Sequence, residues 1–172
     1  MDGGELPITC GNCGLVVLAK VLNSNGTGTF WLLCPGCREG SVKVTSGAVY
    51  PAAAAGAPVN GLPDDVAQAW REARTVHAVA AYTASEILCR KILMHLAVDV
   101  AGSKPGDTFQ AYIEHLDKAG YIGAGLRPAV EKIKNRGNVA NHALPSSTEA
   151  DSVITLKITE HLLRGIYEIP GL

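Results

Sequence analysis

Four cysteines near the start of the chain constrain its fold more than any other feature of the sequence. Cys10 and Cys13 form one C-x₂-C pair, Cys34 and Cys37 form a second, and twenty residues separate the pairs. Each pair can wrap one side of a tetrahedral ion, because two intervening residues that include a glycine let both thiolates converge. Disulfides or free thiols are the alternative, but the spacing favours a metal site. We therefore expect the first part of the chain to fold around an ion.

The residues between and after the cysteine pairs have the pattern of a small β-sheet. Two apolar-rich runs, 15–23 and 27–34, are separated by Asn25-Gly26, which is a strong hairpin signal because both residues tolerate positive φ. Residues 41–50 alternate apolar and polar side chains and predict a third short strand. The N-terminal part should therefore be rich in strands and turns.

The cysteine spacing on this hairpin resembles a zinc ribbon. The resemblance implies one structural Zn²⁺ per chain, with the ligands Cys10, Cys13, Cys34 and Cys37. Four thiolates fill a tetrahedral shell and leave no position for a catalytic water, and so short a β-rich segment should need the ion to fold. The charges of the side chains in this segment sum to zero. Contact with a protein is therefore at least as well favoured as contact with nucleic acid.

After this segment the sequence changes character twice. Residues 51–62 are rich in Pro, Gly and Ala, which is typical of a linker. Beyond them, apolar residues recur at helical spacing, and the chain of 172 residues is 47% hydrophobic, enough for a sizeable core. We expect a zinc ribbon at 1–50, a flexible or loosely packed linker at 51–62, and an all-α domain at 63–172. The fold class should be α+β in two parts, the second a bundle of about five helices.

Cap and breaker residues indicate where these helices begin and end. Residues 64–101 carry too long a helical pattern for one element, so we expect a break near Arg74–Ala78. Asp107 or Thr108 should cap the third helix, and Ser147 should open the fifth.

Neither a signal peptide nor a membrane span is expected. Acidic residues precede the first apolar run, no small-residue cleavage pattern follows it, and no stretch approaches the roughly 18 uncharged apolar residues of a spanning helix. We expect a cytoplasmic protein without membrane contact, in a reducing compartment that favours metal over disulfides. The fifth thiol, Cys89, lies between apolar residues and should be buried and inert.

The fourth expected helix, residues 125–143, concentrates positive charge in a chain whose net charge is −1. Residues 127–136 carry four basic side chains against Glu131 alone, a local excess of +3. Such an excess attracts a phosphate backbone. The residues expected to contact nucleic acid are Arg127, Lys132 and Lys134.

The same helix ends in the polar stretch "NRGNVANHA", residues 135–143. Asn138 and His142 are four residues apart and share a helix face, and Arg136 can reach round from a neighbouring face. A His can act as general base or acid in the attack of a ribose 2′-hydroxyl on the adjacent phosphate, while an Arg stabilises the charge on the phosphoryl oxygens. Asn138 could position the phosphate or hold the His tautomer. The alternative is structural, because helix ends also use polar side chains of these types.

The stretch "RGNVANH" resembles the Arg-x-x-x-x-x-His signature of the HEPN superfamily of small helical-bundle proteins. More narrowly, "GNVANH", "EILCRKIL" and "IYEIPG" resemble the bacterial family called domain of unknown function 4145, whose members often carry a preceding zinc ribbon. The similarity covers nearly the whole chain. It implies a HEPN-like bundle that forms a homodimer through the helical domain, in which Arg136 and His142 of two subunits meet and cleave RNA without metal.

Two hypotheses for the function follow. The first is an RNA-directed protein, a metal-independent endoribonuclease with Arg136, Asn138 and His142 at a dimer interface, in a stress-response or phage-defence setting. The second is a non-catalytic, dimeric binding or scaffolding module that engages a protein, a nucleic acid or a nucleotide-like ligand.

Overall fold

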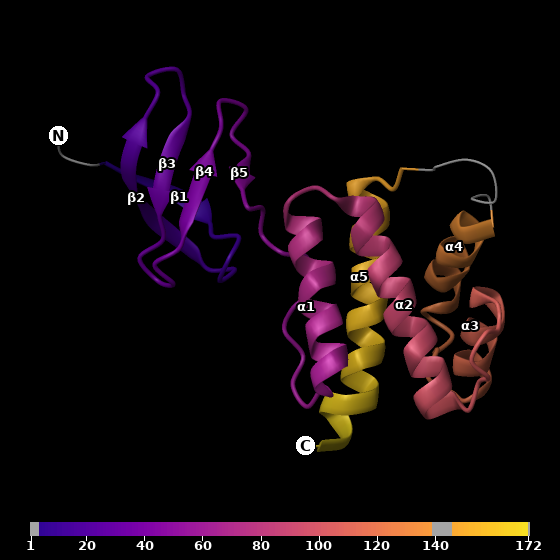
Figure 1. The fold of residues 1–172 in the computed structure, drawn as a ribbon. Coiled ribbons are helices and arrows are strands. Elements are labelled where there is room, and N and C mark those ends of the chain that lie inside the picture. The colour runs from indigo at the N-terminus through magenta and orange to yellow at the C-terminus, as the bar shows by residue number, and fades with distance from the viewer. Residues whose placement is uncertain (1–3, 139–145, 172) are drawn as a thin grey trace. The chain divides into compact units, whose positions relative to one another are not determined.

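The chain has an α+β fold in two parts, as the sequence predicts (Figure 1). The computed structural model describes residues 4–138 and 146–171, and for residues 135–138 it describes the backbone alone. One compact unit comprises Met1–Ala54 with Ala78–Ala80, and the other comprises Ala55–His77 with Ala81–Leu172. We call them the β-unit and the helical unit. None of the helices in the described ranges is long and apolar enough to cross a membrane.

The β-unit is an antiparallel sheet in which every strand pairs with its neighbours in sequence. Its strands are β1 (Glu5–Thr9), β2 (Val16–Ser24), β3 (Phe30–Leu33), β4 (Gly40–Lys43) and β5 (Val49–Tyr50). The predicted hairpin joins β2 to β3, and the Asn25 side chain accepts hydrogen bonds from the backbone N–H groups of Thr27 and Thr29, both at 3.0 Å. Strand β1 was not predicted, and the strand predicted at residues 41–50 is divided into β4 and β5. Strands β1 and β5 form the two edges of the sheet.

One face of this sheet is buried and the other is exposed. Ile8, Ala19 and Leu32 form the small core, because alternate residues of each strand point to the same side. Val16 and Leu18 of β2 point to the opposite side, where Val16 is 80% exposed and Leu18 is 57% exposed. Trp31 of β3 is also exposed. The sheet therefore presents apolar side chains on both of its faces.

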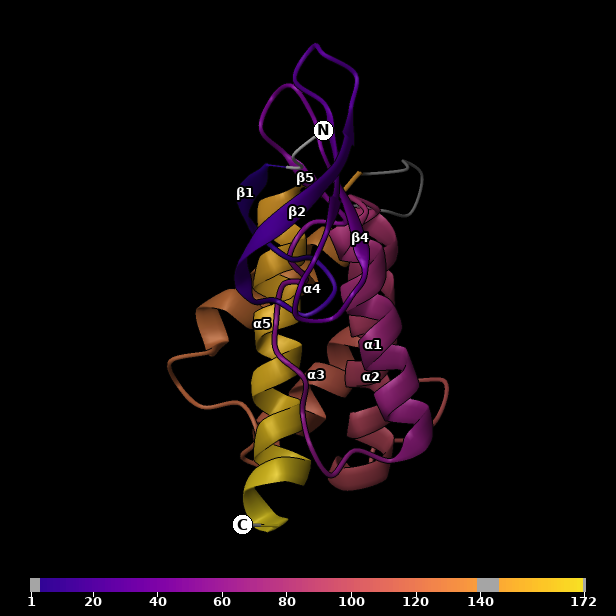
Figure 2. The same ribbon diagram turned by 90° about the vertical axis from the view of Figure 1, so that its left-hand side faces the viewer.

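The helical unit contains the five predicted helices (Figures 1 and 2). They are α1 (Asp64–Ala78), α2 (Tyr82–Ala101), α3 (Phe109–Lys118), α4 (Arg127–Asn138) and α5 (Glu149–Leu163), and a π-helical turn, Arg164–Glu168, continues α5. Leu93 and Leu96 of α2, Leu116 of α3 and Leu156 of α5 are fully buried in one core. Helix α2 packs against both α3 and α5 and is the central element of this unit.

The helix boundaries follow local chemistry, with one correction. The break between α1 and α2 lies just beyond the expected region, and Thr108 caps α3 by accepting a hydrogen bond from the Ala111 N–H. Thr148, and not Ser147, caps α5: its hydroxyl accepts from the Asp151 N–H, and the Asp151 carboxylate accepts from the Thr148 N–H. The capping box needs an acid three residues after the cap, and Asp151 supplies it only for Thr148.

The segment predicted as a linker, residues 51–62, is divided between the two units. From Ala55 onward the chain belongs to the helical unit and is hydrogen-bonded to it. Trp70 donates its indole N–H to the Ala57 carbonyl at 3.1 Å, and the Ala57 N–H donates to the Glu160 carboxylate at 3.1 Å. Residues 55–62 are therefore part of the helical unit, held by hydrogen bonds.

Candidate functional site

The four cysteines predicted as metal ligands converge at one end of the β-unit. Cys10 follows β1 directly and Cys34 follows β3 directly, so the sheet register brings the two C-x₂-C turns together. The Sγ atoms of Cys10 and Cys37 are 3.7 Å apart, those of Cys13 and Cys34 are 3.8 Å apart, and all four lie within 4.8 Å of one another. All five cysteines of the chain lie within the described residues, and none forms a disulfide.

These distances fit a tetrahedral metal ion. With a metal–sulfur distance of about 2.3 Å, the edge of a tetrahedron of thiolates is about 3.8 Å, close to the two sulfur–sulfur distances. A disulfide would need sulfurs about 2 Å apart. The donor set and its geometry show that the cluster could bind a metal, as predicted.

The two C-x₂-C turns have the same backbone geometry. The Cys10 carbonyl accepts from the Gly14 N–H at 2.8 Å, and the Cys34 carbonyl accepts from the Arg38 N–H at 3.0 Å. Gly14 and Arg38 occupy equivalent positions and both have positive φ, 74° and 64°. Glycine adopts this conformation readily, whereas for an arginine it is strained. Arg38 therefore adds a cost in backbone energy to the second turn.

The sulfurs affect one another's protonation. Backbone N–H groups of Cys37 and Gly36 stabilise the Cys34 thiolate and lower its pKa to about 7. For Cys37, the backbone at Glu39 lowers the pKa, but burial and the adjacent thiols of Cys10 and Cys34 outweigh it and raise the pKa to about 12. Negative charges at this distance repel one another, so ionisation of all four thiols is disfavoured. A bound cation would remove that penalty.

The basic residues expected to contact nucleic acid are partly neutralised by acidic partners. Arg127 of α4 pairs with Asp117 of α3 at 3.1 Å, and Lys134 pairs with Glu131 at 3.1 Å. Lys132 is exposed. Because ion pairing lowers the net field of a patch, α4 presents less positive potential than its sequence suggests.

The predicted catalytic residues lie at the limit of the described chain. The backbone of Arg136 and Asn138 belongs to the last turn of α4. Their side chains, and the whole of His142, lie outside the described residues. The proposed Arg/His pairing therefore stays a prediction.

Cys89 is fully buried in the helical core, and burial raises the pKa of its thiol to about 12. This agrees with the expectation of an inert core cysteine. Elsewhere in the unit, His77 Nδ1 and Ser152 Oγ are both buried and hydrogen-bonded at 2.8 Å. Burial lowers the pKa of His77, so the imidazole is neutral at physiological pH and serves the structure.

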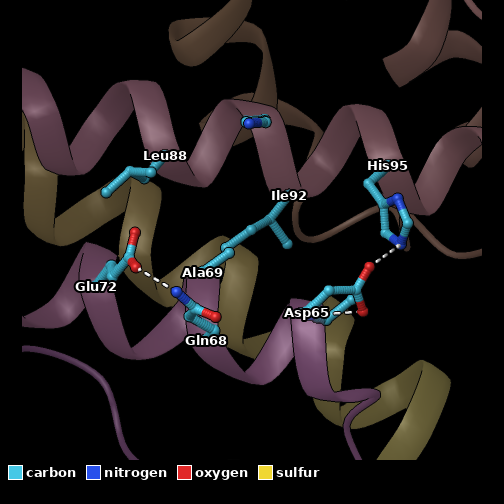
Figure 3. A pocket seen from close by; sticks show the side chains of 9 residues that line it. Asp65, Gln68, Ala69, Glu72, Leu88, Ile92 and His95 are labelled. Atoms are coloured by element: carbon cyan, nitrogen blue, oxygen red, sulfur yellow. Dashed lines mark hydrogen bonds and ion pairs between the residues drawn. The ribbon is translucent and has the colours of Figure 1, made fainter.

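A groove between α1 and α2 was not predicted. Its volume is about 310 Å³, and Figure 3 shows side chains of both helices converging on it. The lining residues are Asp65, Val66, Gln68, Ala69 and Glu72 of α1, and Leu88, Lys91, Ile92 and His95 of α2. At one end the His95 imidazole lies 3.9 Å from the Asp65 carboxylate and 3.0 Å from that of Asp99. Both helices show the i, i+3, i+4, i+7 spacing that could have indicated a shared face.

One comparison with known proteins finds a match, to a family. The model of a family described as domain of unknown function (DUF4145) matches residues 71–172, which is more than half of the chain and includes all helices from α2 to α5. No curated protein and no solved structure matches the chain.

Proposed function

We propose that this chain, which belongs to the family described as domain of unknown function (DUF4145), is a non-catalytic binding and scaffolding protein. One zinc ion holds the β-unit together, and the exposed apolar face of its sheet contacts a protein partner. The single observation that carries this proposal is that face, on which Val16, Leu18 and Trp31 are exposed although the opposite face already supplies the core.

Zinc is the ion that the four-cysteine centre favours. An all-thiolate, tetrahedral donor set selects soft or borderline ions, and Zn²⁺ has no redox chemistry that would disturb a structural role. Four sulfur ligands leave no open position for substrate or water. The test is elemental analysis of purified protein, for which we expect about one zinc per chain. Iron in place of zinc, or a β-unit that stays folded after metal removal, would contradict this assignment.

The exposed face has the composition of a protein interface. Soluble monomers rarely leave several large apolar side chains exposed side by side, and such patches mark interaction sites. Lys20 lies on the same face of β2 as Val16 and Leu18, and it is paired in register with Glu5 of β1. Lys20 is also opposite Leu33 of β3, so this pair of opposite charges lies between Leu18 and Trp31 on the exposed face. Opposite charges within an apolar face give orientation without a strong net field. A protein surface suits this patch better than a phosphate backbone does.

The experiment compares two substitutions at similarly exposed apolar residues. Leu18→Lys alters the sheet face, and Ile169→Lys alters a residue of similar exposure in the helical unit, 57% and 61%. A partner captured by the wild type from a lysate of the source cells would be purified and its binding measured by calorimetry. We expect Leu18→Lys to abolish binding and Ile169→Lys to preserve it. Equal affinities for both variants would refute the proposed role of the face.

A second candidate function is metal-independent RNA cleavage by a HEPN-like dimer. It is supported by the Arg136–His142 spacing and by a helix α4 that extends to Asn138. In this proposal His142 moves the proton of the attacking 2′-hydroxyl, Arg136 stabilises the charge on the phosphoryl oxygens, and Asn138 positions the phosphate. Lys132, Arg127 and Lys134 then attract the RNA backbone.

Labelled RNA in EDTA-containing buffer without Mg²⁺ tests this second candidate. Cleavage by the wild type that is lost in both Arg136→Ala and His142→Ala would support it. The absence of cleavage by the wild type, or cleavage that both variants retain, would exclude it. Light scattering on the same samples would show whether the homodimer that this candidate requires is formed.

A further inference from the structure

We propose that the groove between α1 and α2 is a docking site for a basic amphipathic helix of a partner protein. The groove lies wholly within the helical unit, so the inference goes beyond the proposed role of the β-unit and does not depend on it. Three observations carry it: the groove's shape, its apolar floor and the distribution of charge along its two rims.

The shape of the groove matches a helix. On α1 it runs from Asp65 to Glu72 and on α2 from Leu88 to His95, so its two ends are seven residues apart on each helix. Seven residues rise about 10 Å, or two turns, so the groove accepts two turns of a third helix packed along the first two. At about 310 Å³ it is at the lower limit for a small-molecule pocket, and it is partly open to solvent.

The floor of the groove is apolar. Val66 and Ile92 are buried at its base, and Ala69 and Leu88 are partly buried beside them. Figure 3 shows Leu88, Ile92 and Ala69 directed toward the space between the helices. Because the side chain of Ala69 is small, a leucine of a docked helix can approach the floor between the larger side chains of Leu88 and Ile92.

The charges on the rims define the occupant. The α1 rim carries Asp65 and Glu72, seven residues apart, and both are exposed. Glu72 accepts a hydrogen bond from Gln68 at 3.0 Å, and Asp65 is approached at 3.9 Å by His95, whose closer partner is Asp99. On the α2 rim the one lysine is Lys91.

Two carboxylates at i and i+7 are complementary to two cationic side chains at the same spacing on a helix laid alongside. Between those cations, the residues at i+3 and i+4 of the partner would face the apolar floor. The acidic α1 rim disfavours a nucleic acid, because phosphates would meet Asp65 and Glu72 first. The occupant is therefore a helix with lysines or arginines at i and i+7 that flank leucines at i+3 and i+4.

The test uses two fluorescein-labelled synthetic helical peptides and measures anisotropy with the full chain. One peptide carries Lys at i and i+7 with Leu at i+3 and i+4, and the other has Glu in place of Lys. We expect the wild type to bind the Lys peptide at least about tenfold more tightly than the Glu peptide, with an affinity that falls as salt rises. In the double variant Asp65→Lys/Glu72→Lys the preference should reverse.

The matched control is Glu114→Lys on α3. Glu114 accepts a hydrogen bond from Gln110 four residues earlier at 3.0 Å, just as Glu72 does from Gln68. This control should keep the wild-type preference. The reversed preference of the double variant would itself show that the variant is folded, because an unfolded chain would bind neither peptide selectively.

Three results would overturn the proposal. One is the absence of binding to either peptide up to about 1 mM. Another is a preference that the double variant leaves unchanged. The third is a dimer seen by light scattering that the double variant dissociates, since a second copy of this chain would then occupy the groove.

Discussion

Gly11 lies within the first C-x₂-C turn, where the backbone of residues 51 and 52 approaches it closely. A Cβ atom at this position would lie 2.6 Å from the Ala52 carbonyl oxygen and would also overlap the Pro51 carbonyl. Both obstacles are backbone atoms, so no side-chain rotation can relieve the overlap. We predict that Gly11→Ala displaces this turn from the chain that covers it and weakens the metal centre.

The size of the effect follows from the geometry. Cβ atoms essentially never lie within 3.0 Å of a heavy atom from a residue that is not adjacent in the chain, so the turn or the 51–52 segment must shift. Overpacking of this kind costs about 1–3 kcal/mol. Because folding of the β-unit and metal binding are linked, the same free energy is lost from metal affinity, which should fall about 5- to 150-fold.

Gly36, in the second C-x₂-C turn, provides the control. A Cβ there would make only ordinary contacts, with Leu15 Cδ1 at 3.6 Å and the Cys34 Sγ at 3.7 Å. Gly36→Ala should therefore preserve zinc affinity, or raise it slightly by restricting the unfolded chain. The assay is competition for zinc with a chromophoric chelator, performed on both variants in parallel. If Gly11→Ala holds zinc as tightly as Gly36→Ala does, the reasoning from the close approach is wrong.

Three further predictions concern the stability of the two units. Arg38→Gly should stabilise the metal-loaded β-unit by about 1 kcal/mol and Gly14→Ala should destabilise it by a similar amount, since both positions have positive φ. Thermal denaturation measures both effects, and a shift of the two midpoints in the same direction would contradict the strain. Thr148→Ala removes the α5 cap and should cost about 1 kcal/mol in urea unfolding, whereas an unchanged midpoint would rule out the cap's contribution. Burial lowers the pKa of His77, so the unfolded chain binds the proton first as pH falls. The stability that His77 contributes is then complete above about pH 6.5 and declines below it, and His77→Asn should flatten this decline in unfolding midpoints measured from about pH 7 to 5.

The metal centre could be predicted because its chemistry is local. Two C-x₂-C turns bring each pair of thiolates together irrespective of the rest of the fold, and the Asn25-Gly26 hairpin between them brings the pairs to one end. The helices could be predicted for the same reason, because periodicity and caps act within a few residues. The exception was the start of α5, where Ser147 and Thr148 are adjacent cap formers and only the position of Asp151 decides between them.

The paired charges of α4 could not be predicted from local sequence. A count over residues 127–136 gives an excess of +3, but Asp117, which pairs with Arg127, belongs to α3 and lies ten residues earlier in the chain. Its position is decided by the packing of α3 beside α4. The electrostatic potential of a helix depends on such neighbours as well as on its own side chains.

The sequence by itself determined the chemistry that acts over short separations, namely the four-cysteine cluster, the strand and helix patterns and the division into a β-rich and an all-α part. Tertiary structure alone decided which face of β2 is exposed, because the run from Val16 to Val21 is apolar on both sides except for Lys20, and its pattern does not distinguish the core face from the outer one. Tertiary structure also decided that a groove forms between α1 and α2. Each helix carries its own stripe, but a groove exists only once two stripes face each other at a particular register, and that register is fixed by packing across the whole core.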